Sequence, residues 1–247
     1  HTRFKCDWSS DVCSSDLGER TGVPALLAVQ LAKHYGDRPA LEPLDLQVAA
    51  GEHVALVGHN GSGKTTLLRM TAGLLDPTGG EVRVMGHRAG SVAARRALSW
   101  LSDSPTFYDD LSLWEHLEYV GRLHGVSEWE SRAESLLERL QLVARRDDIP
   151  ATFSRGLRQK SAIALGMVRP FEVLLVDEPF VGLDANGKTV LLELLDEAAA
   201  AGATLLVATH ELAFVQRVSR LIALRDGAVV YDGAPADADV HALVLPA

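Results

Sequence analysis

Apolar and polar positions divide the chain into regions with different periodicities. Residues 26–57 contain short apolar runs separated by polar turns, which predicts two antiparallel strands leading into a buried third strand. A glycine-rich turn, "GHNGSGKT" at 58–65, follows directly and opens a helix. The apolar residues of this helix are Leu67, Leu68, Met70 and Leu74. The segment "PTGGEVRVMG" then predicts a turn and a further edge strand.

The middle of the chain, about residues 99–168, has helical periodicity instead. Ser112 with Glu115, and Ser127 with Glu130, have the spacing of capping boxes at helix starts. Apolar residues follow them at helical spacing, namely Leu113, Leu117, Val120, Trp129, Ala133, Leu136, Leu137 and Leu140. This pattern predicts an inserted helical subdomain.

The last third of the chain alternates between strand and helix patterns. The runs "VLLV" at 173–176 and "TLLVA" at 204–208 are separated by the helical segment "GKTVLLELLDEAAAAG". This alternation indicates parallel strands joined by a crossover helix, and the polar residues at the strand ends mark a site. "LIALRDGAVVYDG" predicts a hairpin on its Asp-Gly turn. We therefore expect one α/β domain with a mainly parallel sheet, an N-terminal antiparallel β subdomain and the helical insertion.

Composition narrows the class of protein. The 247 residues are 47% hydrophobic and 23% charged, which suits one or at most two globular domains. The longest apolar runs are far shorter than the roughly 18 residues of a membrane span, so we expect no span. A formal net charge of -9 without a cluster of Lys and Arg argues against a nucleic-acid-binding surface.

The first 17 residues do not fit the rest of the chain. Cys6 and Cys13 lie in "CDWSSDVCSSDL", which one reading frame of a common sequencing-adapter DNA encodes. We expect residues 1–17 to be a non-native tail, followed by the domain at 18–235 and a C-terminal tail at 236–247. The alternative, a redox pair or metal clip, lacks a paired His/Cys cluster. The remaining chain is free of cysteine, which fits a reducing cytoplasm.

The segment "GHNGSGKT" satisfies G-x-x-x-x-G-K-[ST] between a buried strand and a helix. Its glycines allow backbone conformations that aim N–H groups at phosphates, and the helix dipole adds positive potential. Lys64 would reach the terminal phosphates, and the Thr65 hydroxyl would bind Mg²⁺. The residues expected to bind nucleotide here are Gly58, His59, Asn60, Gly61, Ser62, Gly63, Lys64, Thr65 and Thr66.

Two adjacent carboxylates, Asp177 and Glu178, stand at the exit of the buried strand predicted at 173–176. Neighbouring side chains of a strand point in opposite directions, so the two acids can take different roles. We expect Asp177 to hold Mg²⁺, directly or through water, and Glu178 to polarise the attacking water. His210 follows the next strand and can bond a γ-phosphate or the water; Tyr35 can stack on adenine or belong to the core.

These motifs, in this order, resemble those of ATP-binding-cassette (ABC) ATPases from about Leu26 to Gly233, which implies the P-loop NTPase fold with a RecA-like core. In that family a signature, usually L-S-G-G-Q, begins a helix some twenty residues before the catalytic carboxylates. "FSRGLRQKSAIAL" occupies this place, because Ser154 precedes Asp177 by 23 residues. Ser154 and Gly156 are retained, whereas Arg155 replaces the first glycine. Arg155 either adds a phosphate contact or obstructs the dimer.

The resemblance assigns further roles. His210 is similar to the switch histidine and Tyr35 to the adenine-stacking aromatic of the family. "FVGLD" resembles the D-loop and puts Asp184 at the dimer seam. Asp103 stands where the family has the Q-loop glutamine, so a shorter, charged side chain would have to accept from metal-bound water.

The resemblance implies an ATP- and Mg²⁺-dependent ATPase that dimerises around two ATP molecules, as a homodimer or heterodimer. Lys64, Glu178 and His210 would be catalytic, and Ser154, Arg155 and Gly156 would act on the other protomer's ATP. The expected partner is an integral-membrane permease of exporter type, on the inner, cytoplasmic face of the cell membrane. The alternatives are a soluble ABC ATPase, for example in cofactor assembly, and a module that binds nucleotide without useful hydrolysis.

Overall fold

A computed structural model of the chain describes residues 22–244. The adapter-like tail at 1–17, with Cys6 and Cys13, lies outside these residues, as do the last three residues of the segment 236–247. The described chain divides into two compact units. The sheet unit comprises residues 22–100, 171–179 and 202–244, and the helical unit comprises residues 101–170 and 180–201.

Within residues 22–244, the sheet unit contains a four-stranded antiparallel sheet of order β2-β1-β4-β5. Its strands are β1 (Leu26–Tyr35), β2 (Arg38–Val48), β4 (Gly79–Val84) and β5 (His87–Arg88). The two predicted N-terminal strands pair as expected, with Leu26 opposite Val48. The strand predicted within "PTGGEVRVMG" is confirmed as β4, but it is not the edge of the sheet, because the two-residue strand β5 pairs with Arg83 and Val84 at its end. Two residues are too few to leave a period in the sequence.

A second sheet, six-stranded in the part of the chain described, has the order β10-β9-β3-β8-β7-β6. Its strands are β3 (His53–Val57), β6 (Leu98–Leu101), β7 (Val173–Asp177), β8 (Thr204–Ala208), β9 (Arg220–Arg225) and β10 (Ala228–Gly233). β3 pairs in parallel with β8 and β9, and β7 in parallel with β8, whereas β9 and β10 form the expected hairpin. The predicted α/β class is confirmed. Residues 99–101, assigned by sequence to the helical region, lie in a strand.

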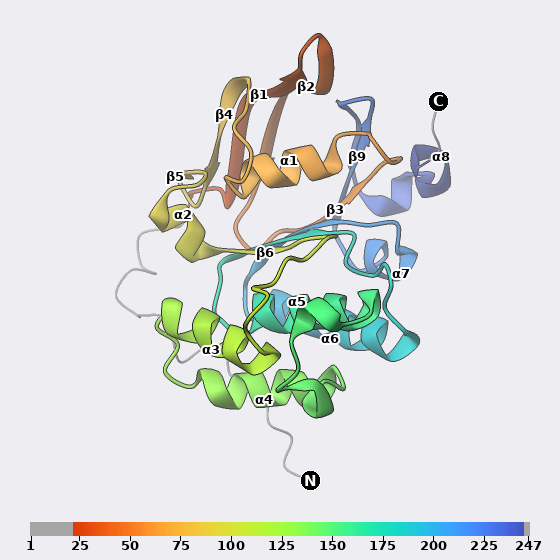
Figure 1. The fold of residues 1–247 in the computed structure, drawn as a ribbon. Coiled ribbons are helices and arrows are strands. Elements are labelled where there is room, and N and C mark those ends of the chain that lie inside the picture. The colour runs from red at the N-terminus through yellow and green to blue at the C-terminus, as the bar shows by residue number, and fades with distance from the viewer. Residues whose placement is uncertain (1–21, 245–247) are drawn as a thin grey trace. The chain divides into compact units, whose positions relative to one another are not determined.

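Helix α1 (Lys64–Thr71) lies between the two sheets of the sheet unit (Figure 1). Leu67, Leu68 and Met70 are almost completely buried in the core that both sheets share. Leu74, expected on the same helix, lies beyond it and is exposed. Gly73 explains the difference, since its positive φ of 70° ends an α-helix at this point.

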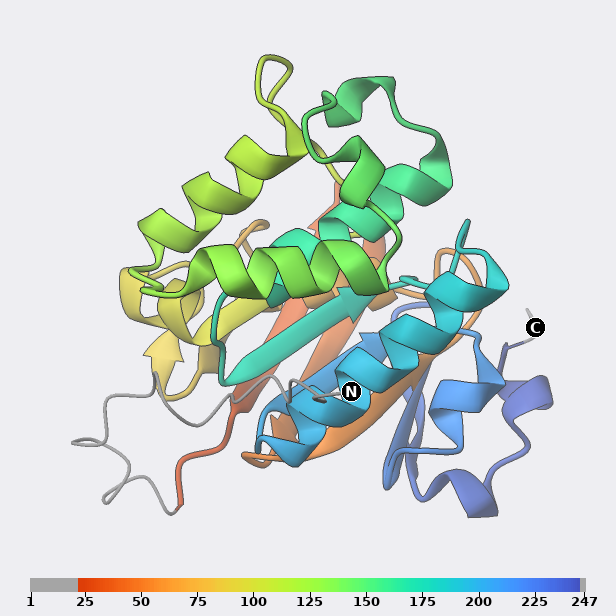
Figure 2. The same cartoon turned by 90° about the horizontal axis from the view of Figure 1, so that it is seen from below.

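The helical unit consists of α3 (Leu113–Leu123), α4 (Trp129–Arg139), α5 (Arg155–Met167) and α6 (Ala185–Ala200), with 3-10 turns at Val143–Arg145 and Pro150–Thr152. In Figure 2, α3 and α4 are the yellow-green and green helices that pack together. The capping box of Ser112 and Glu115 is confirmed. The one at Ser127 is wrong: α4 begins at Trp129 after an N-cap at Glu128, without a side-chain cap.

The packing of Trp129 accounts for this later helix start. A β-carbon on Gly121 of α3 would come within 2.5 Å of the Trp129 Cβ, so the two helices touch closely there. The Trp129 ring also lies 5.1 Å from the ring of Trp114. Tertiary contacts that local spacing does not encode therefore fix the first turn of α4.

The remaining helices are short and belong to the sheet unit: α2 (Val92–Ala97), α7 (Leu212–Val215), a 3-10 turn at Pro235–Asp237 and α8 (Val240–Val244). The segment expected as a C-terminal tail thus contains helix α8, whose Ala242 carbonyl accepts a hydrogen bond from Arg225 on β9 at 3.1 Å. Between residues 22 and 244, every helix is too short or too polar to span a membrane.

Candidate functional site

The phosphate loop, residues 58–65, connects β3 to α1 in the sheet unit. Gly63 is the N-cap of α1, with φ 107° and no side-chain cap. A β-carbon there would come within 2.8 Å of the Ala40 carbonyl oxygen, so only glycine fits. The first N–H groups of α1 are consequently left for an anionic ligand, which the helix dipole also favours.

Lys64 is the charged side chain of this loop, and it is buried. Its Nζ donates hydrogen bonds to the carbonyl oxygens of Gly58 at 2.5 Å and His59 at 3.3 Å. Burial lowers the pKa of Lys64, and the nearby carboxylates of Glu178 and Asp177 oppose this shift. The loop therefore already curls around an ammonium group that can exchange carbonyl partners for phosphate oxygens.

The two carboxylates at the end of β7 have different environments. Asp177 is completely buried, whereas the Glu178 side chain is 19% exposed. Glu178 has a φ of 44°, a left-handed conformation that costs a non-glycine residue about 1–2 kcal/mol. Its N–H donates to the carbonyl of Ala208 at 2.8 Å, which holds this turn against the end of β8. Such an unfavourable backbone is typical of functional sites.

Glu178 lies between two basic groups. The Lys64 Nζ lies 3.8 Å from its Oε1, and the Nε2 of His210 lies 3.0 Å from the same oxygen. His210 follows β8 and is partly exposed. The structure thus brings together three residues that the sequence singled out from widely separated positions, beside the phosphate loop.

The other residues of the phosphate loop and its vicinity differ in how far they are exposed to solvent. Ser62 is fully buried, and its hydroxyl has no hydrogen-bond partner within residues 22–244. Thr65 and Thr66 are half-buried, and Asn60 and Gly61 are exposed. Tyr35 ends β1 with 58% of its surface exposed. Tyr35 is therefore not a core residue, and its ring is accessible for stacking on adenine.

The signature-like segment begins α5 in the helical unit. Ser154 is the N-cap, and its hydroxyl accepts a hydrogen bond from the Leu157 N–H at 3.3 Å. A hydroxyl that accepts can still donate its own proton to a ligand. A β-carbon on Gly156 would come within 2.7 Å of the Gly182 carbonyl oxygen, so this glycine permits close approach of the D-loop segment. The exposed Arg155 lies with its methylene stem along Gly182.

Lys160 is a residue that the sequence analysis missed. It lies one turn after Gly156 on α5, and its Nζ donates to Asp184 Oδ2 at 2.8 Å. The other carboxylate oxygen of Asp184 caps α6 by accepting from Gly187 N–H at 2.6 Å. The signal was a lysine within the largely apolar stretch "KSAIAL", where burial demands an ionic partner.

Asp103 also belongs to the helical unit. Its carboxylate oxygens accept hydrogen bonds from the hydroxyls of Ser102 at 3.2 Å and Ser104 at 3.3 Å. The site residues thus form two groups. Tyr35, the phosphate loop, Asp177, Glu178 and His210 lie in the sheet unit, and Asp103, Ser154, Arg155, Gly156 and Asp184 lie in the helical unit.

Comparison with known proteins supports a nucleotide-binding role. Residues 41–181 match the model of the ABC transporter family. A putative ABC transporter ATP-binding protein of Halobacterium salinarum is 38% identical over 217 residues, which cover 84% of this chain and 92% of that protein. The SkfA peptide export ATP-binding protein SkfE of Bacillus subtilis is 32% identical over 211 residues, covering 84% of this chain and 88% of that protein.

A solved structure extends the similarity to the fold. The ATP-binding cassette MJ0796, described as a dimer in a post-hydrolysis state bound to ADP and Pi, matches with a TM-score of 0.77 and 25% identity. The match covers 85% of this chain and 98% of that one. Together with the phosphate loop and its carboxylates, these similarities show that the chain belongs to the ABC transporter family, as an ATP-binding ABC ATPase with the P-loop NTPase fold.

Proposed function

We propose that the chain is the ATP-hydrolysing subunit of an ABC transporter, that it dimerises around two ATP molecules, and that it drives a separate membrane permease. The observation that carries the proposal is the cluster of Lys64, Glu178 and His210 beside the phosphate loop. It combines a cation for phosphate charge, a carboxylate for the attacking water and an imidazole in one place.

In the proposed reaction, a water oxygen attacks the γ-phosphorus and the bond to the β–γ bridging oxygen breaks, giving ADP and phosphate. Glu178 accepts the proton of the water; such a base typically contributes about 10²- to 10⁴-fold to the rate. Lys64 would offset charge on the phosphates. His210 would donate from its ring to the γ-phosphate, while its position 3.0 Å from Glu178 keeps that carboxylate oriented.

We assign the nucleotide to residues 58–66, with the exposed ring of Tyr35 against adenine. Mg²⁺, when bound with ATP, would neutralise phosphate charge. Thr65 and the buried Asp177 would hold it. Mg²⁺ needs only one or two carboxylates besides phosphate oxygens. This fits the finding that residues 22–244 contain no group of three His, Cys, Asp or Glu suited to a metal.

For the dimer, we propose that Ser154 and Gly156 act on the ATP of a second subunit, with Asp184 at the seam. The exposed Ser154 hydroxyl and the N–H groups at the start of α5 suit a phosphate, since a helix N-terminus attracts anions. Arg155 is exposed and its side chain lies along Gly182, so we infer that it does not close this surface. The dimeric state described for MJ0796 supports this proposal.

We infer export as the direction of transport and the inner, cytoplasmic face of the cell membrane as the location. The export function in the name of the relative SkfE supports the direction. An integral-membrane permease would then be the second partner, and nucleic acid would not be one, in keeping with the formal net charge of -9.

Phosphate release by the purified chain, compared with Ser154→Arg, tests the proposal. A bulky cation at an exposed helix cap of the helical unit should abolish hydrolysis while leaving binding of the fluorescent analogue mant-ATP intact. Hydrolysis by both proteins at equal rates would contradict a signature acting between protomers. Binding without hydrolysis by the wild type would favour a nucleotide-binding module.

A further inference from the structure

The tip of the β9–β10 hairpin, residues 224–227, lies against the phosphate loop although the two segments are far apart in the sequence. Figure 1 shows the loop that precedes α1 running toward β9. Both belong to the sheet unit. Catalysis as described above does not use the hairpin, so these contacts need an explanation of their own.

One direct contact is a backbone hydrogen bond. The Gly227 N–H donates to the carbonyl of Ser62 at 3.0 Å. Ser62 is fully buried, and within the loop its own N–H donates to the His59 carbonyl at 3.1 Å. The Gly227 carbonyl in turn accepts from the Glu42 N–H of β2 at 2.9 Å. The turn is therefore a bridge that joins the middle of the phosphate loop to the antiparallel sheet.

Close approach of the two backbones extends this contact. A β-carbon on Gly58 would come within 2.1 Å of the Leu224 carbonyl oxygen, and one on Gly63 within 3.5 Å of the Gly227 Cα. The hairpin thus lies against the first and the last glycine of the phosphate loop. The hairpin therefore restrains Gly58, Ser62 and Gly63, whereas Asn60 and Gly61 between them are exposed.

A side-chain contact completes the arrangement. Asp226 Oδ1 lies 3.4 Å from the Nε2 of His59, the second residue of the phosphate loop. Asp226 is 75% exposed, and the pair attracts only when His59 is protonated. Exposed pairs contribute little, so the backbone contacts of Gly227 carry most of the effect.

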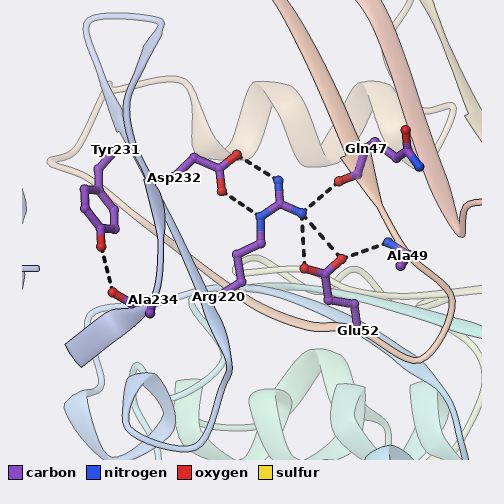
Figure 3. Close-up of polar contacts among 7 residues, drawn as sticks. All are labelled: Gln47, Ala49, Glu52, Arg220, Tyr231, Asp232 and Ala234. Carbon is purple, nitrogen blue, oxygen red and sulfur yellow. Dashed lines mark hydrogen bonds and ion pairs between the residues drawn. The ribbon is translucent and has the colours of Figure 1, made fainter. Parts of the chain in front are cut away.

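The hairpin itself is anchored at its open end (Figure 3). The Arg220 guanidinium donates two hydrogen bonds to Asp232, at 2.6 and 2.7 Å, and binds Glu52 at 3.1 Å and the Gln47 carbonyl at 2.8 Å. Glu52 also accepts from the Ala49 N–H at 2.8 Å. This network fixes the base of the hairpin to the β2–β3 turn, so its tip is held firmly enough to position another loop.

We propose that the Asp226–Gly227 turn positions the phosphate loop for ATP, with Gly227 as the main positioning residue. This inference rests on the proposed assignment of ATP to residues 58–66. The hydrogen bond from Gly227 to the Ser62 carbonyl would hold the backbone of the phosphate loop in the conformation that receives the phosphates. Loss of the hydrogen bond between Gly227 and Ser62 should reduce the free energy of nucleotide binding by more than it reduces the free energy of unfolding.

The test compares two glycine-to-alanine variants of the full chain. At Gly227, with φ 82°, a β-carbon would meet Glu42 N and Leu41 Cα at 3.2 Å. Gly202 is a matched control, because its φ is 90° but no described atom lies within 4 Å of the β-carbon position. Both variants suffer the same kind of backbone strain, and only Gly227→Ala displaces the turn.

Titration with mant-ATP at a temperature where all proteins are folded gives the readout. We expect Gly227→Ala to raise Kd about tenfold and Gly202→Ala to change it by less than about twofold. Equal affinities, or equal losses in the two variants, would overturn the inference. If the wild type itself did not bind mant-ATP, the proposed nucleotide site would be wrong as well.

A second measurement on the wild type needs no variant. Saturation with a non-hydrolysable ATP analogue should slow hydrogen exchange in peptides covering both 58–66 and 224–229, because the two segments share a hydrogen bond. Protection of 58–66 with unchanged exchange at 224–229 would refute a positioning role.

Discussion

The ion pair of Lys160 and Asp184 links the signature-like helix to the D-loop segment, and breaking it should destabilise the helical unit. The Lys160 side chain is 7% exposed and Asp184 58% exposed, with 2.8 Å between the charged atoms. Exposed pairs contribute about 0.2–1 kcal/mol, whereas loss of one partner of a buried pair costs about 3–5 kcal/mol. For this half-exposed pair we expect Asp184→Asn to cost about 1–2 kcal/mol of unfolding free energy.

The choice of asparagine isolates the ion pair. In Asp184→Asn the side-chain amide oxygen would still accept from the Gly187 N–H and keep the cap of α6, whereas Asp184→Ala would lose the cap at a further cost of about 1 kcal/mol. Lys160→Met and the double variant complete a thermodynamic cycle, measured by urea denaturation. We expect a coupling energy of about 1 kcal/mol between the two substitutions. If the losses of the two single variants added up to that of the double variant within about 0.3 kcal/mol, the ion pair would not contribute to stability.

The same pair predicts a dependence on pH. The hydrogen bond from Lys160 is the main cause that lowers the pKa of Asp184 below its usual 3.8. A depressed folded-state pKa contributes stability above the unfolded pKa and loses it as the pH falls through the folded value. The stability difference between wild type and Asp184→Asn should therefore be constant near neutrality and disappear only below 3.8. A difference that disappeared at higher pH would contradict this cause.

Two further predictions concern Arg220 and Arg155. Arg220→Met should lower the unfolding free energy by about 1–3 kcal/mol in urea denaturation, because Glu52 and Asp232 lose a shared cation. Arg220→Lys should retain part of this unfolding free energy, since lysine keeps the charge but lacks the two-pronged geometry of the guanidinium group. An unchanged urea midpoint in both variants would contradict this role of Arg220. Arg155→Gly should leave phosphate release within about twofold, because the exposed Arg155 side chain lies along Gly182 and makes no hydrogen bond or ion pair within residues 22–244. A drop of about tenfold in the rate of phosphate release would show instead that Arg155 contributes to hydrolysis.

Local patterns were sufficient for much of the fold and for the chemistry of the sheet unit. The phosphate loop needs glycines and a lysine at fixed spacing, and the β7 carboxylates follow a continuous apolar run, so both could be found without tertiary information. The hairpin depended on one Asp-Gly dipeptide. In each case the decisive interactions lie within about ten residues of one another, where sequence pattern carries the most information.

The errors have tertiary causes. Ser127 has the letters of a cap, but packing of Trp129 on Gly121 fixes a later helix start. Leu74 fits the helical spacing, but Gly73 ends α1 before it. The contacts of Lys160 with Asp184 and of Gly227 with Ser62 join distant segments, and no local period encodes such pairs.

The most direct test of the central claim, that this chain binds ATP with its phosphate loop and hydrolyses it with Glu178 in a dimer, uses Glu178→Gln. Glutamine cannot accept the proton from water, so ATP should remain bound. We predict that light scattering with ATP and Mg²⁺ gives a stable species of twice the monomer mass for the variant, with phosphate release abolished. Unchanged phosphate release, or a variant that stays monomeric at saturating ATP, would contradict the account.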